Sequence, residues 1–592
     1  MEVIKEERLY SDKHIMSRLL KYSKPHYKSF IAAFLLMLVP IGAELVTPLL
    51  LGKVVSILKA DNIEFNKIIY IIICYCVIIV SSSISGYFHT IILQKTGQNI
   101  IYTVREEIFE HIEKLSANQI NNLPVGKLVT RVTNDTNNLN ELYTSVIISL
   151  LKSSLTLIGV VIMMFIVNVQ ITLYILISAP FVFGLSLLFR KLSRRAYRQV
   201  RNNITDVNTF LSENISGIKI TQTFNQEDKK FNEFCSKNNN LKKSQLNQIF
   251  IFSIFRPAIY GLYILTIILL LYFGSMNNLS GGVVTAEIIV IFYQYVRSFF
   301  NPLQELADQF NVLQSAFASS EKIFSLLDTA PEIIDSPDAI ELEDFKGEIE
   351  FKDVWFSYIP DEWVLKGVSF KVLPNQTVAF VGATGSGKTT ILSLIVRNYD
   401  IQKGQILIDG KDIKTYTIAS IRRNIGQMLQ DVFLFSGSIL SNIQLKDDTI
   451  SLEDVKKATK YVNADKFIER LPNQYEEVVR ERGNNFSSGQ RQLISFARTI
   501  VHKPKLMILD EATANIDTET EALIQDSLEK MMSIGTMLIV AHRLSTIQHS
   551  DNIIVLSKGK IIESGTHQEL LKNKKHYYNL YRLQYEHSQK ND

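Results

Sequence analysis

Six long apolar segments in the first part of this 592-residue chain most constrain its fold. A helix needs about 20 predominantly apolar residues to cross a bilayer. The overall composition agrees with membrane spans, since 46% of the residues are hydrophobic and the mean hydropathy is +0.10. The six candidate spans, with loose boundaries, are Phe30–Leu51, Ile68–Leu93, Val146–Val167, Ile171–Phe189, Ile251–Phe273 and Val283–Phe300.

The distribution of basic residues predicts the orientation of these spans. Lys21, Lys24 and Lys28 precede the first span, and Arg190–Phe250 carries a run of Arg and Lys after the fourth span. The short connections after the third and fifth spans contain no basic residue. By the positive-inside rule, both termini and the two long connections are expected in the cytoplasm. Those connections, Gln94–Tyr143 and Arg190–Phe250, are polar and predict helices that extend beyond the bilayer.

A change of pattern after Leu326–Phe345 marks a domain boundary, because this stretch contains Pro331, Pro337 and several acids. Short apolar strands then alternate with helical stretches and glycine turns, which indicates a mainly parallel sheet flanked by helices. The predicted strands are Thr377–Val381, Gln405–Ile408, Lys505–Leu509, Thr536–Val540 and Asn552–Leu556. The expected organisation is an N-terminal elbow (1–28), a membrane domain with two long intracellular loops (29–325), a linker (326–345) and an α/β domain (346–592).

A phosphate-binding loop is predicted between an apolar strand and a helix, where the sequence fits GxxxxGK[ST]. Its glycines let backbone N–H groups close around phosphate oxygens, and the helix N-terminus favours an anion. Lys388 is expected to reach the β- and γ-phosphates of ATP, and the Thr389 hydroxyl to bind Mg²⁺. The residues expected to hold the nucleotide here are Gly382, Ala383, Thr384, Gly385, Ser386, Gly387, Lys388, Thr389 and Thr390.

Three further residues follow predicted strand ends. Asp510 is expected to act on Mg²⁺, and Glu511, the next residue, is the candidate for polarising an attacking water. The alternative for this acidic pair is a helix N-cap. His542 follows another strand and is expected to contact the γ-phosphate, although an isolated His is more often structural. Glu511 and His542 are therefore the predicted catalytic residues.

The stretch Phe486–Gln490 resembles the signature sequence of ABC ATPases, and the chain resembles a half-transporter of the six-span multidrug and lipid exporter class. The resemblance covers nearly the whole chain. It implies an α-helical six-span membrane domain followed by an ABC-type P-loop ATPase domain with antiparallel and helical subdomains. It also implies that Tyr358 stacks on adenine and that Gln430 binds Mg²⁺ and senses the membrane domain.

The membrane half carries further parts of the resemblance. Gly126–Arg131 with Asp135, and Glu213–Lys219, resemble the two intracellular-loop motifs of the exporters. The resemblance implies short coupling helices near Asn121 and Phe224 that contact ATPase domains. Glu481, Arg482 and Gly483 resemble the exporter-specific loop before the signature.

One ATPase domain in one chain implies a dimer. In the family each ATP lies between the P-loop of one domain and the signature of the other, where Ser487, Gly489 and Gln490 would cap the γ-phosphate. Here Ser488 replaces the first glycine of the usual LSGGQ, and its Cβ is expected to restrict the backbone and crowd the nucleotide. Ala514–Asp517 likewise replaces the usual SALD. These departures favour a heterodimer with a second half-transporter, and a homodimer is the alternative.

The predicted function is ATP-driven export of a hydrophobic or amphipathic compound across a bacterial plasma membrane, with ATP and Mg²⁺ as cofactors. The net charge of +4 gives no reason to expect nucleic acid as a partner. Glu44, between Pro40 and Pro48 in the first span, could bind cationic substrates, and helix packing or a headgroup-level position explains it equally well. The alternatives are a lipid, peptide or siderophore exporter, or an ATP-gated regulatory membrane protein.

Overall fold

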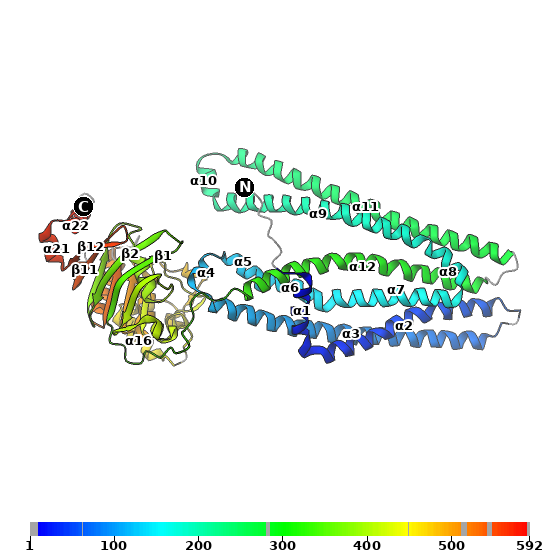
Figure 1. Cartoon of the computed structure of the whole chain (residues 1–592), viewed down its shortest axis with the longest axis horizontal. Helices are drawn as coiled ribbons and strands as arrows, with labels where there is room; N and C mark the ends of the chain where they lie inside the picture. The colour runs from blue at the N-terminus through cyan, green and yellow to red at the C-terminus, as the bar shows by residue number, and fades with distance from the viewer. Residues whose placement is uncertain are drawn as a thin grey trace. The chain divides into compact units, whose positions relative to one another are not determined.

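The computed structural model describes residues 10–61, 63–279, 285–447, 449–510, 518–540 and 547–588. The chain forms two compact units (Figure 1). The helical unit comprises Met1–Glu113 and Val125–Thr329, and the α/β unit comprises Lys114–Pro124 and Ala330–Asp592. A short segment from the N-terminal half therefore belongs to the α/β unit.

The helical unit is built from long helices. By length and composition, four helical stretches among the described residues can cross a membrane: Asp12–Leu58, Phe65–Lys114, Val125–Val167 and Glu227–Gly274. The segment predicted as the fourth span is helical as well, within α8 and α9, and the predicted sixth span is helical from Ala286 onward, within α12. The long helices, together with the short helices α1, η1 and α8 that precede some of them, are α1 (Asp12–Ser23), η1 (Lys24–His26), α2 (Tyr27–Leu58), α3 (Phe65–Lys114), α7 (Ile147–Val167), α8 (Val169–Leu176), α9 (Ser178–Ser216), α11 (Glu227–Leu279) and α12 (Ala286–Leu327).

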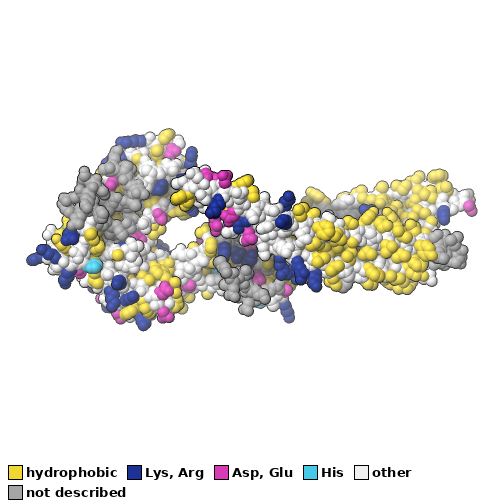
Figure 2. Space-filling model, turned by 90° about the horizontal axis from the view of Figure 1, so that it is seen from above, with side chains coloured by type: hydrophobic (Ala, Val, Ile, Leu, Met, Phe, Trp, Pro, Cys, Tyr) yellow, Lys and Arg dark blue, Asp and Glu magenta, His cyan; other side chains and the backbone are white. Residues whose placement is uncertain are grey.

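The surface of the helical unit is divided by polarity. Hydrophobic side chains cover the part of the helical unit that contains the predicted membrane spans, and Lys and Arg side chains lie at the edge of this apolar surface (Figure 2). On α3, for example, Ile69, Tyr70 and Val77 are each more than half exposed. Exposed apolar patches of this extent are typical of surfaces that face lipid or another protein.

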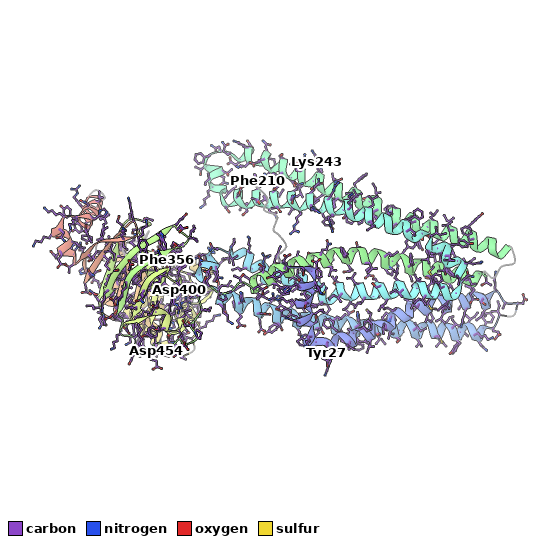
Figure 3. The ribbon with its side chains drawn as sticks, viewed as in Figure 1. Tyr27, Phe210, Lys243, Phe356, Asp400 and Asp454 are labelled. Atoms are coloured by element: carbon purple, nitrogen blue, oxygen red, sulfur yellow. The ribbon has the colours of Figure 1, made fainter. Side chains whose placement is uncertain are left out.

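Two helix groupings organise this unit. α9 and α11 pair along their length, and α12 packs against α2 and α7. Phe210 of α9 lies beside Phe234 of α11 with ring centroids 6.2 Å apart, and Figure 3 labels Phe210 and Lys243 on these neighbouring helices. The connection from α3 to α7 consists of short elements. It begins with α4 (Ala117–Asn121), which belongs to the α/β unit, and continues in the helical unit with α5 (Val125–Thr130), the π-helical η2 (Arg131–Asp135), α6 (Thr136–Glu141) and the π-helical η3 (Leu142–Val146).

Two prolines lie inside the membrane helix α2. Pro40 has no N–H to donate to the carbonyl of Leu36, four residues earlier. The Ser85 hydroxyl of α3 donates to that carbonyl at 2.7 Å, and the Tyr295 hydroxyl of α12 donates to the carbonyl of Leu45 at 2.8 Å, close to Pro48. A neighbouring helix thus satisfies the carbonyl that Pro40 leaves without its helical partner, as an apolar environment requires.

The α/β unit is centred on a six-stranded sheet in the order β12-β11-β3-β10-β9-β6. Its inner strands run parallel, and every residue of β3, β9 and β10 is buried, as in sheets that helices cover on both faces. The strands are β3 (Thr377–Val381), β6 (Ile425–Met428), β9 (Leu506–Asp510), β10 (Thr536–Val540), β11 (Asn552–Ser557) and β12 (Lys560–Gly565).

A second, antiparallel sheet has the order β2-β1-β4-β5. The predicted strand Gln405–Ile408 belongs to this sheet, within β4, and not to the parallel one. Its sequence identifies a strand but not the strand's neighbours. The strands are β1 (Ile349–Ser357), β2 (Trp363–Val372), β4 (Lys403–Ile408) and β5 (Lys411–Asp412).

Helices surround the two sheets and complete the predicted fold class, which is confirmed. They are α13 (Lys388–Ile395), η4 (Ile413–Thr415), α14 (Ile418–Arg423), α15 (Ile439–Gln444), α16 (Leu452–Tyr461), α17 (Asp465–Ile468), η5 (Gln474–Glu476), η6 (Glu481–Gly483), α18 (Ser488–Val501), α19 (Thr518–Met532), α21 (His567–Asn573) and α22 (His576–Ser588). A two-stranded ribbon, β7 (Gly437–Ser438) with β8 (Val478–Val479), lies beside α15.

Candidate nucleotide-binding site

The parallel register brings the predicted site residues to one edge of the sheet. Val540 of β10 lies opposite Phe380 of β3 on one side and Asp510 of β9 on the other, and Met428 of β6 lies opposite Leu509. The P-loop, Asp510 and Gln430 therefore all lie at the carboxyl ends of neighbouring strands. Glu511, Ala514–Asp517 and His542 fall outside the described residues.

The loop between β3 and α13 has the backbone that its glycines permit. Gly385 and Gly387 have φ of +79° and +105°, in the left-handed region that other residues avoid. A Cβ at Gly387 would lie 2.6 Å from a methyl of Leu365, and one at Gly382 would collide with the carbonyl oxygen of Leu556. Glycine is thus required here both by conformation and by space.

Lys388 and Ser386 place polar groups inside this loop. The Lys388 ammonium is buried and donates to the carbonyls of Gly382 at 2.8 Å and Ala383 at 3.1 Å. The Ser386 hydroxyl is also buried, and no described residue accepts or donates a hydrogen bond to it. A buried hydroxyl without a partner calls for a ligand, and a phosphate oxygen would supply one. The exposed residues Ala383, Thr384 and Gly385 form the outer turn of the loop.

Thr389 and Asp510 lie next to each other although they are 121 residues apart in the chain. The Thr389 hydroxyl donates to Asp510 Oδ1 at 3.2 Å, and Gln430 lies two residues beyond β6 at the same sheet edge. A hydroxyl, one carboxylate and an amide oxygen suit Mg²⁺, which keeps several waters and binds substrate phosphates. The described residues contain no group of three His, Cys, Asp or Glu that would hold a metal ion without such help.

Tyr358 lies beside the first turn of α13. Its hydroxyl is 3.1 Å from the hydroxyl of Thr390, and its ring makes edge contacts with Phe356 (4.9 Å) and Tyr399 (5.1 Å). Figure 3 labels Phe356 in this region. Tyr358 remains 42% exposed, so its side chain is accessible for an adenine to stack on. Tyr399 was not predicted, because no motif marks it in the sequence.

The signature residues form the N-terminus of the 14-residue helix α18. Ser487 is the N-cap: its hydroxyl accepts from the Gln490 N–H at 3.2 Å, and Gln490 Oε1 accepts from the Ser487 N–H at 3.0 Å. Ser487 is exposed and Gly489 is buried. An exposed hydroxyl at a helix N-terminus suits contact with a phosphate.

Ser488 has an ordinary helical backbone. It is the first residue of α18 and is not among the residues with positive φ. Its Cβ therefore causes no backbone strain in this conformation. The reason to expect an effect of Ser488 on ATP hydrolysis is therefore that its Cβ would crowd the nucleotide.

Arg498, later in α18, is a functional candidate that the sequence did not reveal. Its guanidinium donates to the carbonyls of Asn442 at 2.9 Å and Phe433 at 3.1 Å. It thus joins the signature helix to the segment that follows Gln430. Burial lowers the pKa of Arg498, although an arginine retains its charge at any physiological pH.

Short helices lie at both positions where coupling helices were expected. α4 ends at Asn121, belongs to the α/β unit, and begins with a capping box of Ser116 and Gln119. α10 (Ile218–Thr223) joins α9 to α11 in the helical unit and is followed by the exposed Phe224. In the first intracellular-loop motif, Arg131 and Asp135 form an ion pair at 2.7 Å within η2.

Comparisons with known proteins agree with this geometry. Residues 30–303 match the family described as ABC transporter transmembrane region, and residues 365–514 match the family described as ABC transporter. YknV of Bacillus subtilis, an uncharacterized ABC transporter ATP-binding protein, is 38% identical over 571 residues, covering 96% of this chain and 94% of the relative.

Two further similarities concern exporters. YheH of Bacillus subtilis, a probable multidrug resistance ABC transporter ATP-binding/permease protein, is 36% identical over 525 residues, covering 88% of this chain and 77% of the relative. The solved structure of a bacterial Atm1-family ABC exporter with ATP bound aligns with a TM-score of 0.80 at 25% identity, covering 94% of this chain and 98% of that one.

Proposed function

The chain belongs to the ABC transporter family, as an exporter-type half-transporter that joins one membrane domain to one ATPase domain. From this premise we propose that it exports hydrophobic or amphipathic compounds, of the multidrug type, across the plasma membrane. The ATPase domain and both termini lie in the cytoplasm in this proposal. The relative YheH supports the multidrug assignment by its description.

The observation that carries the proposal is the position of α4. This short helix follows α3, an apolar helix long enough to cross a membrane, and yet it belongs to the ATPase unit. Within that unit, Asn121 Nδ2 of α4 donates to the Tyr399 hydroxyl at 3.4 Å, and Tyr399 packs on Tyr358. The nucleotide site is therefore connected by contacts to an element that continues from a membrane helix, which favours a transporter over an independent ATPase.

Each site residue has a distinct role in the proposed ATP site. Lys388 and the P-loop N–H groups bind the phosphates, and Tyr358 binds adenine by stacking. Thr389, Asp510 and Gln430 would hold Mg²⁺, which when bound neutralises charge that develops on the transferred phosphoryl group. Glu511 orients and polarises the attacking water, and His542 supports the γ-phosphate. Ser487, Gly489 and Gln490 act on the nucleotide held by the partner's P-loop.

We propose a heterodimer as the working assembly, and the altered signature with Ser488 supports it. In that pair this chain supplies the catalytic acid, and its signature faces a partner's nucleotide. A homodimer is the other possible arrangement. No nucleic acid takes part in either.

The test is transport by the purified dimer in sealed vesicles. ATP should drive movement of a fluorescent amphipathic dye, and Glu511→Gln should leave nucleotide binding intact and stop most turnover. Near-normal hydrolysis by Glu511→Gln would overturn the catalytic assignment. ATP hydrolysis without movement of any dye or lipid would instead favour a regulatory role.

A further inference from the structure

The linker between the two domains is packed against the ATPase domain along most of its length. Its first part, residues 330–336, begins three residues after α12 ends at Leu327. Pro331 and Pro337 fix φ near either end of this part, which limits its flexibility. We call residues 330–336 the strap.

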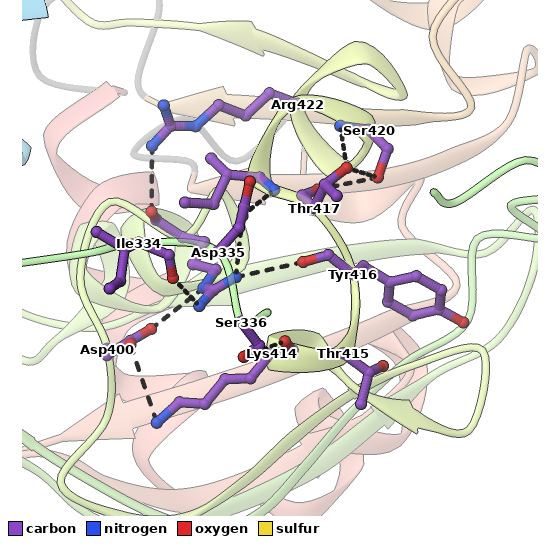
Figure 4. A network of polar contacts seen from close by, with 12 residues as sticks. Ile334, Asp335, Ser336, Asp400, Lys414, Thr415, Tyr416, Thr417, Ser420 and Arg422 are labelled. Atoms are coloured by element: carbon purple, nitrogen blue, oxygen red, sulfur yellow. Dashed lines mark hydrogen bonds and ion pairs between the residues drawn. The ribbon is translucent and has the colours of Figure 1, made fainter. Parts of the chain in front are cut away.

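One end of the strap holds a buried arginine. Arg397 is only 2% exposed and lies just after the P-loop helix α13, with φ of +54°. Its guanidinium donates to the carbonyl of Ile334 at 3.2 Å and pairs with Asp335 at 3.8 Å (Figure 4). A non-glycine residue stays in this sparsely populated conformation only when its surroundings hold it there.

The same guanidinium also binds the ATPase domain. It donates to the carbonyl of Tyr416 at 3.3 Å and pairs with Asp400 at 3.3 Å. Arg422 completes the arrangement from α14, donating to the carbonyls of Val396 at 3.2 Å and Arg397 at 3.1 Å. Burial, together with the charge of Arg397, lowers the pKa of Arg422. Arg422 thus binds the two carbonyls that directly follow the P-loop helix, and Arg397 binds the strap.

Further hydrogen bonds fix the position of the strap along the segment 414–418 of the ATPase domain. Asp335 Oδ1 accepts from the Ile418 N–H at 2.8 Å, in the first turn of α14, and the Ser336 hydroxyl donates to the carbonyl of Lys414 at 3.2 Å. After the strap, Ile340 forms a parallel bridge with Tyr416. These contacts place the strap on the segment 414–418, which Arg397 also binds.

The other end of the strap holds the coupling helix α4. Glu332 Oε2 accepts from the Ser116 hydroxyl at 3.0 Å and from Asn118 Nδ2 at 3.1 Å. Gln119 Nε2 donates to the carbonyl of Ala330 at 2.8 Å, and the Glu332 N–H donates to Gln119 Oε1 at 3.2 Å. Four hydrogen bonds therefore join α4 to the strap, all within the ATPase unit.

We infer that the strap is a rigid connection between α4 and the P-loop helix, and that Arg397 is a positioning residue for ATP binding. Arg397 fixes the C-terminal end of α13, whose N-terminal residues Lys388 and Thr389 bind the nucleotide. A displacement of α4 would reach α13 through Glu332, Asp335 and Arg397. The inference rests on the proposed ATP site, because Arg397 acts on the nucleotide only through α13.

Arg397 itself is a poor first target, because removing one partner of a buried ion pair destabilises a fold strongly. Asp335 and Glu332 are exposed and can be changed with less risk. Asp335→Ala removes the ion pair with Arg397 and the hydrogen bond from the Ile418 N–H, so that only the Ile334 carbonyl still joins the strap to Arg397. Glu332→Gln weakens the bonds of the strap to α4. Asp338→Asn is the matched control, since Asp338 is an exposed linker carboxylate for which the structure gives no hydrogen bond or ion pair with a described residue.

The experiment measures ATP hydrolysis, binding of a fluorescent ATP analogue and thermal unfolding of the full-length dimer in nanodiscs. Asp335→Ala should raise the KM for ATP and the Kd for the analogue about three- to tenfold, with kcat within about twofold. Glu332→Gln should leave both constants unchanged and reduce stimulation of hydrolysis by a transported dye. Arg397→Lys, which keeps the charge but loses the fork of donors, should raise KM in the same direction as Asp335→Ala.

Other outcomes overturn the inference. A lower melting temperature in Asp335→Ala without a change in KM or Kd would make the strap merely structural. An equal shift of the KM for ATP in Asp338→Asn would show that the loss of a negative charge, and not the loss of the contact with Arg397, causes the effect.

Lys388→Ala tests the ATP site separately. If that variant hydrolyses ATP normally, the proposed ATP site is wrong and the strap inference falls with it. If it is inactive while Asp335→Ala behaves as wild type, only the strap inference fails.

Discussion

Asp510 is the residue whose charge the proposed chemistry needs most. In the structure the Thr389 hydroxyl donates to Asp510 at 3.2 Å. Asp510→Asn can still accept this hydrogen bond, but it loses the negative charge that would face Mg²⁺. We therefore predict an intact fold and a kcat for ATP lowered by about a hundredfold or more. The measurement is ATP hydrolysis by the purified dimer as a function of Mg²⁺ concentration.

A second aspartate provides the control for this prediction. Asp551 accepts from the Thr377 N–H at 2.8 Å, at the amino end of β3 and thus at the opposite edge of the sheet. Asp551→Asn should change kcat by no more than about twofold. The prediction is contradicted if both variants lose activity to the same degree, because charge at the site would then not be the cause.

At the same scale, the site residues fall into those that the sequence could reveal and those that it could not. Lys388 and Thr389 belong to a local motif with its own spacing. Arg397 belongs to none, and an arginine in a polar stretch is normally solvated. Its burial depends on Ile334, 63 residues away, whose carbonyl it binds. Whether the Cβ of Ser488 strains the backbone depends on where α18 begins, which the sequence leaves open by a residue or two.

Among the helices, α2 contains Pro40, and the backbone hydrogen bond that this proline lacks is replaced by a neighbouring helix. Ser85→Ala removes the hydroxyl that satisfies the Leu36 carbonyl left without a partner by Pro40. Hydrogen bonds of this kind between membrane helices contribute about 0.6 to 1.7 kcal/mol. We predict a melting temperature for Ser85→Ala lower than wild type, measured by thermal unfolding in nanodiscs, with the ATP KM unchanged.

The matched control lies one half-turn away on the same helix. Ser83 is exposed, and the structure gives its hydroxyl no partner among the described residues. Ser83→Ala should therefore unfold at the wild-type temperature. Equal melting temperatures for the two alanine variants would show that the Leu36 carbonyl does not need Ser85.

Element by element, the sequence predicted the strands better than their pairing. Thr377–Val381 and Thr536–Val540 were predicted with the bounds that β3 and β10 have, because short apolar runs between turn residues are distinctive. The sheet to which β4 belongs was not predictable, since pairing depends on contacts distant in sequence. The π-helical turns η2 and η3 were likewise not predicted, because no residue pattern marks them.

At the scale of the whole molecule, the open question is the identity of the second half. A heterodimer places Ser488 against a partner's nucleotide, at a site whose own catalytic acid would be missing. A homodimer places it against a site completed by Glu511. We predict that this chain purified alone hydrolyses ATP at roughly a tenth or less of the rate of the co-expressed pair. Robust, dye-stimulated hydrolysis by the chain alone would contradict the prediction.

Ser488→Gly separates the two arrangements more directly. Because Ser488 has ordinary helical backbone at the start of α18, glycine there should leave the fold intact and open space toward the nucleotide. In a homodimer both active sites gain that space, so hydrolysis should rise. In the heterodimer only the site without a catalytic acid gains it, so we expect turnover within about twofold of wild type. Ser488→Ala keeps the Cβ without the hydroxyl and shows which of the two matters. A clear rise with glycine and none with alanine would establish that Cβ crowds a working site, and would overturn the unequal pair.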